Sequence, residues 1–472
     1  MTKRQAIPTA PEPLEAYARH FDSLFGKSNQ RDEFRRYLEG LLLPTERNKT
    51  LTGLANTEPA VGAQHPRAQG MQWFLSESNW QERQLQERRL HLLLEEASTA
   101  PNSQGVLVID EHGDRKRGHK TAHIGKQYLA NVGKIDTGVV SVTSLWADEG
   151  VYYPVDFEPY TPADYFAEGK QAGLFRTKLK IGVELVRRAV QVPLPFRAVV
   201  ADSFYGEDRG FRQGLRDLHV GYVLALKPSH AWYHPEAEIG SFQEAAQEAG
   251  WEGAERPGHW IKVPRTFRDG SSQDWWALEL DIRPFGPDKS ERVVIATTDP
   301  VTLPDLSTFY LITNLPVPGS SRAQESEFAA ASVEEVVRLY GLRMWVEESY
   351  KQVKHALGWS EYQVRSDQAI RRHWQLVCCA FSFCWYHQAH LPATVPLEPA
   401  QPPSTAKPEQ DKASGEHKAR KKKGGRKVGA ATSVLAQSAA GGSRVARTLG
   451  LTPTVLACVV STSPTTPAPA AP

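Results

Sequence analysis

The segment GVLVIDEHG at residues 105–113 joins a run of four apolar residues to a charged ending. This pattern is typical of a strand buried inside a sheet, with Asp110 at the end of the strand. The segment RAVVADSFYG at residues 197–206 has the same form and places Asp202 at its end. Either Asp alone is explained as a turn residue that ends a strand. Two such strands favour a shared site, because α/β proteins place ligands at strand ends and paired carboxylates suit a divalent cation such as Mg²⁺.

Strand-like and helical segments alternate around these two strands. GVVSVTSLWA (138–147) and YYPVDFEPY (152–160) alternate like paired strands, and GYVLALK (221–227) predicts another buried strand. Residues 164–190 predict a helix with a break near Gly173. This alternation predicts an α/β fold built on a central sheet.

The flanking regions divide the chain into parts of different character. Residues 12 to about 98 have helical periodicity and predict a helical N-terminal domain, which either binds DNA or caps the main core. Residues 232 to about 320 are strand-like. Helical periodicity returns from residue 332 to about residue 390. The expected boundaries are 1–100 (helical, DNA-binding), 101–231 (core, first part), 232–325 (β-rich insertion), 326–390 (core, C-terminal helices) and 391–472 (tail).

The segment YGLRMWVEESYKQVK at residues 340–354 adds a third carboxylate. On one continuous helix, with ~100° per residue, Tyr340, Arg343, Glu347 and Lys354 share a ~60° stripe, and Glu348 lies well away from it. An exposed charged face with Arg343 paired to Glu347 explains the stripe simply. The mixture of Tyr, Arg, Glu and Lys, followed by apolar sequence, also fits a partly buried helix face that takes part in function.

These residues resemble the DDE transposases of bacterial insertion sequences, in particular the cut-and-paste group with the pattern Y-x2-R-x3-E-x6-K. Every spacing of that pattern is met by Tyr340, Arg343, Glu347 and Lys354. VLVID and VVADSFYG precede it in the expected order, and the resemblance runs from about residue 47 to residue 387. The resemblance implies an RNase H-like catalytic core with a β-rich insertion, preceded by a helical N-terminal domain.

The resemblance also implies the catalytic chemistry. Asp110 on the first strand, Asp202 on the fourth strand and Glu347 on the late helix would be the catalytic carboxylates and would hold two Mg²⁺ ions, which Mn²⁺ can replace. Water would cut a DNA strand at the end of the element, and the freed 3′-hydroxyl would then attack target DNA. Arg343 and Lys354 would bind phosphates near the cut, and Tyr340 would contact the DNA backbone.

The partners expected from this chemistry are double-stranded DNA carrying the terminal repeats of the element and target DNA. Two ends must be paired, so a homodimer in a paired-end complex is expected. A DNA-binding protein derived from a transposase but without catalysis, and an RNase H-like nuclease that only hydrolyses, are the alternatives. The complete set of carboxylates with the Arg and Lys argues against the first, and the wide insertion argues against the second.

A basic segment follows Asp110 and provides further candidates for DNA binding. It either lines the DNA path or is a solvated hairpin. A phosphate loop for a nucleotide is rejected because His119 stands where a Lys would follow the second Gly, and zinc is rejected because His119 and His123 lack a third ligand. The DNA-contact candidates in this segment are Arg115, Lys116, Arg117 and Lys120.

In the resembled group an aromatic residue of the insertion stabilises a flipped base. The candidates here are Trp260, Trp275 and Trp276, for each of which a place in the core is the simpler explanation. Arg265 and Arg268 either support DNA contact or lie on an exposed strand edge.

Charge is distributed unevenly along the 472 residues. The formal net charge is +2, yet residues 391–472 contain 11 basic and 4 acidic residues, so an acidic body precedes a basic tail. The tail holds 11 of the 33 Pro and is expected to be disordered and either to attract DNA nonspecifically or to solubilise the chain. Four Cys without paired spacing, no signal peptide and no apolar run of ~20 residues predict a cytoplasmic protein that does not enter a membrane.

Overall fold

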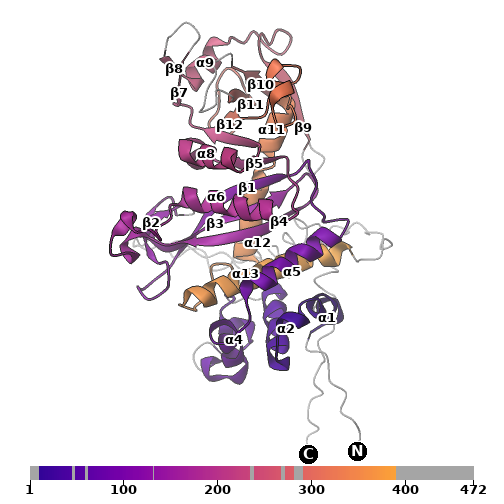
Figure 1. Ribbon diagram of the computed structural model, residues 1–472, viewed down its shortest axis with the longest axis vertical. Coiled ribbons are helices and arrows are strands. Elements are labelled where there is room, and N and C mark those ends of the chain that lie inside the picture. The colour runs from indigo at the N-terminus through magenta and orange to yellow at the C-terminus, as the bar shows by residue number, and fades with distance from the viewer. Residues whose placement is uncertain are drawn as a thin grey trace, which may run out of the picture.

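The computed structural model describes residues 10–44, 48–58, 62–130, 132–233, 239–266, 272–280 and 291–389. The tail at 391–472 and Arg268 therefore lie outside the described residues. The molecule is elongated, with the N-terminal helices at one end, a central sheet in the middle and strands β9 to β12 at the other end (Figure 1).

The first part of the chain is helical. Its elements are α1 (Glu12–Arg19), η1 (Asp22–Leu24), α2 (Ser28–Leu42), α3 (Leu51–Leu54), η2 (Gly62–Gln64), α4 (Pro66–Ser76) and α5 (Glu82–Glu95). Helices α1, α2, α4 and α5 pack around α13 (Asp367–Ala389), whose middle is apolar on all sides. Cys378, Cys379 and Cys384 are buried free thiols in this helix. Among the described residues, no helix combines the length and apolarity needed to cross a membrane.

One large sheet forms the centre of the molecule. Its first strands are β1 (Val106–Arg115), β2 (Gly125–Leu129), β3 (Lys134–Ala147), β4 (Tyr152–Tyr160), β5 (Ala198–Ala201) and β6 (Tyr222–Leu226). The order across the sheet is β4-β3-β1-β5-β6, with β3 antiparallel to its neighbours and β1, β5 and β6 parallel. This order and these directions confirm the α/β, RNase H-like core.

The register of β1 against β5 places the two Asp residues side by side. The parallel ladder runs from Val106 opposite Ala198 to Ile109 opposite Ala201, so Asp110 and Asp202 follow at the same level. The prediction that β1 ends at Asp110 is wrong, because β1 continues to Arg115 through its antiparallel pairing with β3. Asp110 lies level with the end of β5. Asp202 was expected on the fourth strand, but it follows the fifth strand in chain order, because the short strand β2 intervenes.

The strands of the expected insertion extend the same sheet. They are β9 (Ile261–Thr266), β10 (Ser272–Glu279), β11 (Arg292–Thr297) and β12 (Thr308–Thr313). Strand β12 pairs antiparallel with β6, and β11, β10 and β9 follow in order. A two-stranded sheet of β7 (Ala231–Tyr233) and β8 (Ile239–Ser241) and the helix α9 (Phe242–Glu248) precede them.

Helices cover both faces of the central sheet. Helices α6 (Lys178–Gln191) and α8 (Arg209–Asp217) lie in front of the strands in Figure 1, and α12 (Met344–His355) lies behind them. Side chains support this arrangement, because Glu111 of β1 pairs with Lys178 of α6 while its neighbour Asp110 pairs with Arg343 beside α12. Successive strand residues point to opposite faces, so α6 and α12 lie on opposite sides of β1.

Two helix predictions need correction. Residues 164–177 contain only the short turns η3 (Ala163–Tyr165) and η4 (Gly169–Gln171), so the expected helix begins at Lys178, where Thr177 accepts a hydrogen bond from the Lys180 amide. The segment from residue 340 to residue 354 is not one continuous helix. Helix α11 (Val333–Gly341) ends before α12 begins, and a tight turn joins them at Leu342 and Arg343. The remaining short helices are α7 (Ser203–Gly206) and α10 (Ser321–Glu325).

Candidate active site

Asp110 is the most buried of the three candidate carboxylates. Its side chain is 12% exposed and lies on the α12 side of β1. The Glu111 amide donates a 2.7 Å hydrogen bond to Asp110 Oδ1. Burial raises the pKa of Asp110 to about 6, the Arg343 charge opposes the rise, and the Asp202 charge adds to it. Burial therefore disfavours the ionised form of this carboxylate, and the neighbouring cation of Arg343 favours it.

Asp202 stands at the junction of β5 and α7. As the N-cap of α7 it accepts a 3.0 Å hydrogen bond from the Phe204 amide, which orients the carboxylate. Its side chain is 38% exposed, so Asp202 lies at the rim of the site rather than inside it. Beside it a hollow of about 340 Å³ opens, bounded among others by Asp202, Tyr340 and Phe309.

Arg343 brings the three candidate carboxylates together. Its Nη2 lies 2.9 Å from Asp110 Oδ2 and 3.8 Å from Asp202 Oδ2, and its Nη1 lies 4.0 Å from Glu347 Oε1. The three carboxylates come from β1, from the end of β5 and from the first turn of α12. One guanidinium thus lies between carboxylates that are separated by up to 237 positions in the sequence (347 − 110).

Glu347 is the most exposed member of the group, with 66% of its side chain accessible. In the described part of the chain, no three His, Cys, Asp or Glu side chains are gathered closely enough to bind one metal ion. The oxygens of two Asp and one Glu are nevertheless the donor type that Mg²⁺ prefers. The cation that contacts all three is Arg343.

The other motif residues lie close to this centre. Tyr340 is buried, and its ring packs 5.1 Å from Phe309 of β12; burial raises its pKa to about 12. Lys354 lies at the C-terminal end of α12. Its Nζ is 3.9 Å from Asp114 Oδ1, and 20% of its side chain is exposed. Arg343 and Lys354 therefore each face an acid of β1, at the two ends of α12.

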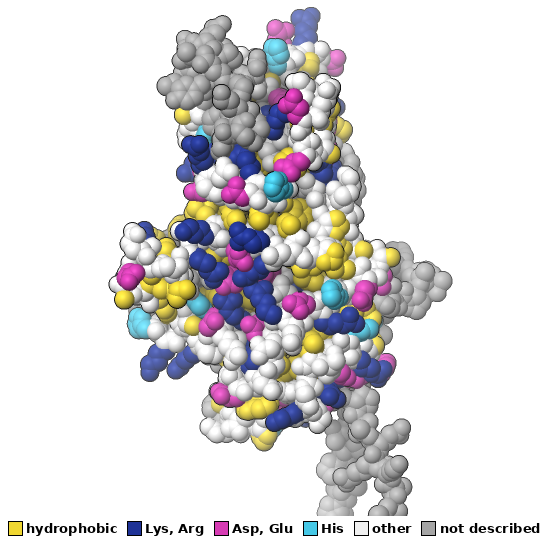
Figure 2. All heavy atoms as spheres, viewed as in Figure 1, with side chains coloured by type: hydrophobic (Ala, Val, Ile, Leu, Met, Phe, Trp, Pro, Cys, Tyr) yellow, Lys and Arg dark blue, Asp and Glu magenta, His cyan; other side chains and the backbone are white. Residues whose placement is uncertain are grey.

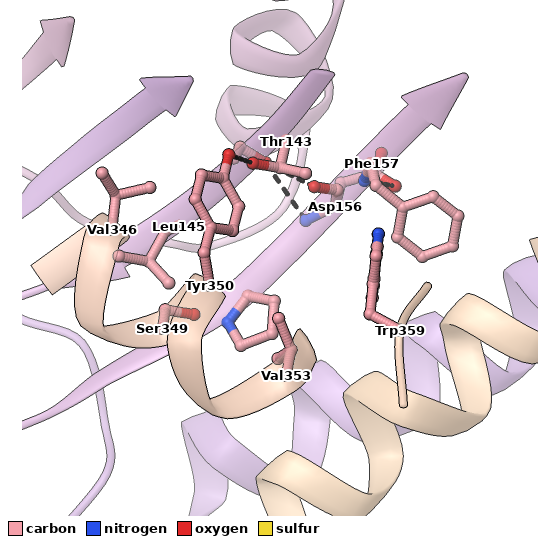
Figure 3. Close-up of a pocket in the computed structure, with 11 residues that line it drawn as sticks. Thr143, Leu145, Asp156, Phe157, Val346, Ser349, Tyr350, Val353 and Trp359 are labelled. Carbon is pink, nitrogen blue, oxygen red and sulfur yellow. Dashed lines mark hydrogen bonds between the residues drawn. The ribbon is translucent and has the colours of Figure 1, made fainter. Parts of the chain in front are cut away.

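Four contacts around the carboxylates were not foreseen from the sequence. Lys178 Nζ lies 2.8 Å from Glu111 Oε1, which places a fourth carboxylate behind Asp110 on the other face of β1. Tyr350 of α12 is partly buried and forms a short hydrogen bond with Thr143 of β3 (Figure 3). His112 lies 4.9 Å from the Tyr350 ring and 3.0 Å from Asp114. Alternation along β1 was the signal that could have placed Asp110, His112 and Asp114 on one face.

A small cavity of about 20 Å³ lies under α12 beside Tyr350. Figure 3 shows Val346, Ser349 and Val353 of α12 facing Thr143 and Leu145 across it. The packing of α12 on β3 and β4 fixes the helix from which Glu347 projects.

The basic segment after β1 divides into two groups. Arg117 and Lys120 are exposed, and Arg115 is 64% exposed with its Nε 3.0 Å from Asp136. Lys116 turns inward, where Nζ donates hydrogen bonds to the carbonyls of Ser360 (2.7 Å) and Tyr362 (3.1 Å) and lies 3.4 Å from the centre of the Tyr362 ring. Burial lowers the pKa of Lys116 to about 8. Lys116 is thus engaged inside the protein, whereas Arg117 and Lys120 face solvent.

Lys and Arg side chains also gather over the middle of the face that carries α6 (Figure 2). Arg side chains also surround two buried carboxylates of β4. Glu158 contacts Arg176, Arg188 and Arg371, and Asp156 contacts Arg83 and Arg188. Much of this positive charge is therefore balanced inside the fold.

The three candidate Trp residues of the insertion are all buried: Trp260 (1% exposed), Trp275 (5%) and Trp276 (8%). Trp275 stacks on Phe309 at 5.3 Å, and the Arg265 guanidinium lies 4.6 Å from the Trp275 ring. These positions fit the core explanation for each Trp. Arg265 lies on β9, the last strand of the sheet among the described residues, and its guanidinium packs on Trp275. His123 contacts Thr161 and Asp367.

Comparisons with known proteins identify the family of the chain. A family model described as "DDE superfamily endonuclease" matches residues 20–268, and a second, "Transposase DDE domain", matches residues 177–383. The chain is 31% identical over 363 residues to the "Probable transposase for insertion sequence element IS701" of Microchaete diplosiphon; the match covers 76% of this chain and 84% of that protein. The chain therefore belongs to the DDE transposases of insertion sequences, enzymes that cleave DNA.

Proposed function

We propose that Asp110, Asp202 and Glu347 are the catalytic carboxylates of this transposase and that they hold Mg²⁺, for which Mn²⁺ can substitute. DDE-type transposases generally use divalent metal ions. The observation that carries the proposal is the convergence of these three side chains on Arg343, from three separate elements of the sheet core. Their oxygens suit a hard cation.

The protein residues have distinct parts in the reaction. A pair of bound Mg²⁺ ions supplies charge stabilisation to the attacking and leaving oxygens of a phosphoryl transfer. Asp110, held by β1 and the Glu111 amide, and Asp202, oriented by the Phe204 amide, present preorganised oxygens to that charge. Glu347, on the first turn of α12, is free to approach from the exposed side.

The basic motif residues bind the phosphates. Arg343 can donate two parallel hydrogen bonds to one phosphate, and Lys354 acts as a point charge at the far end of α12. Arg117 and Lys120 are exposed and extend the basic surface beyond the carboxylates. Tyr340 borders the hollow beside Asp202, where it packs against DNA that enters the site.

The test is strand cleavage of labelled DNA that carries the ends of the element. Asp110→Asn, Asp202→Asn and Glu347→Gln should each lower the cleavage rate by more than about 100-fold, beyond the 10–100-fold cost of losing an outer-shell partner. Glu348→Gln is the matched control, because Glu348 pairs with Lys351 at 2.6 Å, away from Arg343. Cleavage that survives any of the three substitutions, or that is lost in Glu348→Gln instead, contradicts the proposal.

The complete reaction requires more than one copy of the chain. We propose that a homodimer holds two element ends in a paired-end complex and that target DNA binds to this complex. The support is the chemistry: excision of an element requires two cuts, one at each end, in one assembly.

A further inference from the structure

Arg343 contacts all three candidate metal-binding carboxylates. We propose that Arg343 acts as an internal counter-ion that hinders metal binding in the DNA-free protein, and that a DNA phosphate draws it away, so that DNA binding raises the affinity for divalent metal. This inference rests on the proposed function of Asp110, Asp202 and Glu347. It concerns the order in which the site is assembled.

The first argument is the position of the guanidinium. Nη2 lies 2.9 Å from Asp110 and 3.8 Å from Asp202, so one nitrogen faces the two carboxylates that would share a cation. Only 18% of the Arg343 side chain is exposed. A divalent cation and this guanidinium compete for the same oxygens, because both are cations and the space between Asp110 and Asp202 is shared.

The second argument is that Arg343 is bonded incompletely where it lies. Its Nε is buried and, among the described residues, has no hydrogen-bond partner. Its contacts with Asp202 and Glu347 are long, and only the contact with Asp110 has hydrogen-bond length. A phosphate can accept from Nε and Nη together, and this paired geometry is the strong form of arginine–oxyanion binding.

The third argument is access. The hollow beside Asp202, about 340 Å³ in volume, leads to Asp202 and Tyr340 from outside. Arg343 Nη2 lies 3.8 Å from Asp202 Oδ2, and Asp202 lines this hollow, so a backbone phosphate that reaches the hollow approaches the guanidinium. Since DNA and the carboxylates then compete for Arg343, DNA and metal favour one another, and the coupling is reciprocal.

The experiment measures Mn²⁺ binding by the full chain, with free Mn²⁺ followed by electron paramagnetic resonance. Titrations are made without DNA and with a duplex that ends at the already cleaved terminus, so that no cleavage occurs; binding to the duplex alone is subtracted. In the wild-type protein, DNA should tighten Mn²⁺ binding by a factor on the order of 5–150, the usual range for coupled sites. An unchanged affinity overturns the inference without any variant.

Substitution of Arg343 separates its role from that of the remaining charges. Arg343→Gln should bind Mn²⁺ more tightly than wild type without DNA, and DNA should add little. Arg343→Lys keeps a cation and should stay closer to wild type. Arg338→Gln is the matched control, because Arg338 lies on α11 and binds Glu149 and the Gln104 carbonyl, away from the carboxylates. A folded Arg343→Gln protein that binds Mn²⁺ no more tightly than wild type overturns the inference.

Asp110→Asn distinguishes this inference from the proposed function. If Asp110→Asn retains the wild-type Mn²⁺ affinity with and without DNA, the assignment of the metal site to these carboxylates is wrong. If Asp110→Asn loses Mn²⁺ binding but Arg343→Gln does not gain it, the carboxylates hold the metal and only the role of Arg343 is wrong.

Discussion

Individual side chains in this protein take their roles from partners that are distant in the sequence. Arg343 and Asp110 are separated by 233 positions, and Lys116 and Tyr362 by 246. The motif spacing predicted that Arg343 and Glu347 work together, and they do lie near one another. It did not predict that Arg343 contacts Asp110 most closely, because that contact depends on how α12 packs on β1.

Lys116 provides a test at the residue scale. Lys116→Met should lower the free energy of unfolding by about 1–3 kcal/mol, because the partly buried carbonyls of Ser360 and Tyr362 lose their donor. It should leave the salt dependence of DNA binding unchanged. Denaturant unfolding measures the first quantity, and DNA titrations at several salt concentrations measure the second.

The control for Lys116 is its exposed neighbour. Arg117→Ala should leave stability unchanged and lower the slope of log affinity against log salt by about 0.9, the effect of one phosphate contact. If Lys116→Met instead changes the slope as much as Arg117→Ala does and leaves stability intact, then Lys116 binds DNA.

At the scale of elements, β4 joins parts of the chain that are distant in the sequence. Glu158 of β4 contacts Arg176 before α6, Arg188 within α6 and Arg371 of α13. The alternating sequence of β4 predicted a paired strand, and the structure buries all of its residues except the last. Its buried carboxylates were not recognised, because a charge in a strand reveals its partners only when the packed helices are known.

Glu158 should therefore contribute strongly to stability. Burial alone would raise its pKa, but hydrogen bonds and charges from Arg371 and Arg176 outweigh burial and lower it to about 2. The side chain is 5% exposed, and a shift from 4.5 to about 2 corresponds to about 3 kcal/mol, which Glu158→Gln should lose near neutral pH. Thermal and denaturant unfolding measure this loss.

The pH dependence of that loss has a definite direction. Because the pKa of Glu158 is lower in the folded state than in the unfolded state, its contribution is present above about pH 4.5 and is lost as the pH falls toward 2. The difference between wild type and Glu158→Gln should shrink over that window. Glu252→Gln, which removes the partner of Arg256 in an exposed ion pair (side chains 72% and 82% exposed), should change stability by less than about 1 kcal/mol. Equal effects of the two substitutions would contradict this role of Glu158.

At the scale of the whole molecule, one sheet connects parts that the sequence separated. The insertion strands continue the sheet from β6 through β12, so the carboxylate site and the hollow beside it share one frame. The N-terminal helices pack around α13, as a cap would. DNA binding by this helical region remains a prediction.

The expected homodimer is tested by the mass of the assembly. With DNA that carries element ends, light scattering should report two chains, about 105 kDa of protein from 2 × 52.5 kDa, together with two DNA ends. DNA of equal length without an element end is the control. A complex that contains one chain for each separate end would contradict the paired arrangement.

The sequence by itself determined which strands carry Asp110 and Asp202, the spacing of Tyr340, Arg343, Glu347 and Lys354, and thereby the family and its chemistry. These features are local, because apolar runs and fixed spacings depend only on neighbouring residues. The tertiary structure decided that β1 continues past Asp110, that a turn interrupts the motif before α12, and that the Lys116 side chain turns inward. It also decided that Arg343 faces all three carboxylates, since strand register and helix packing bring together residues that no local pattern connects.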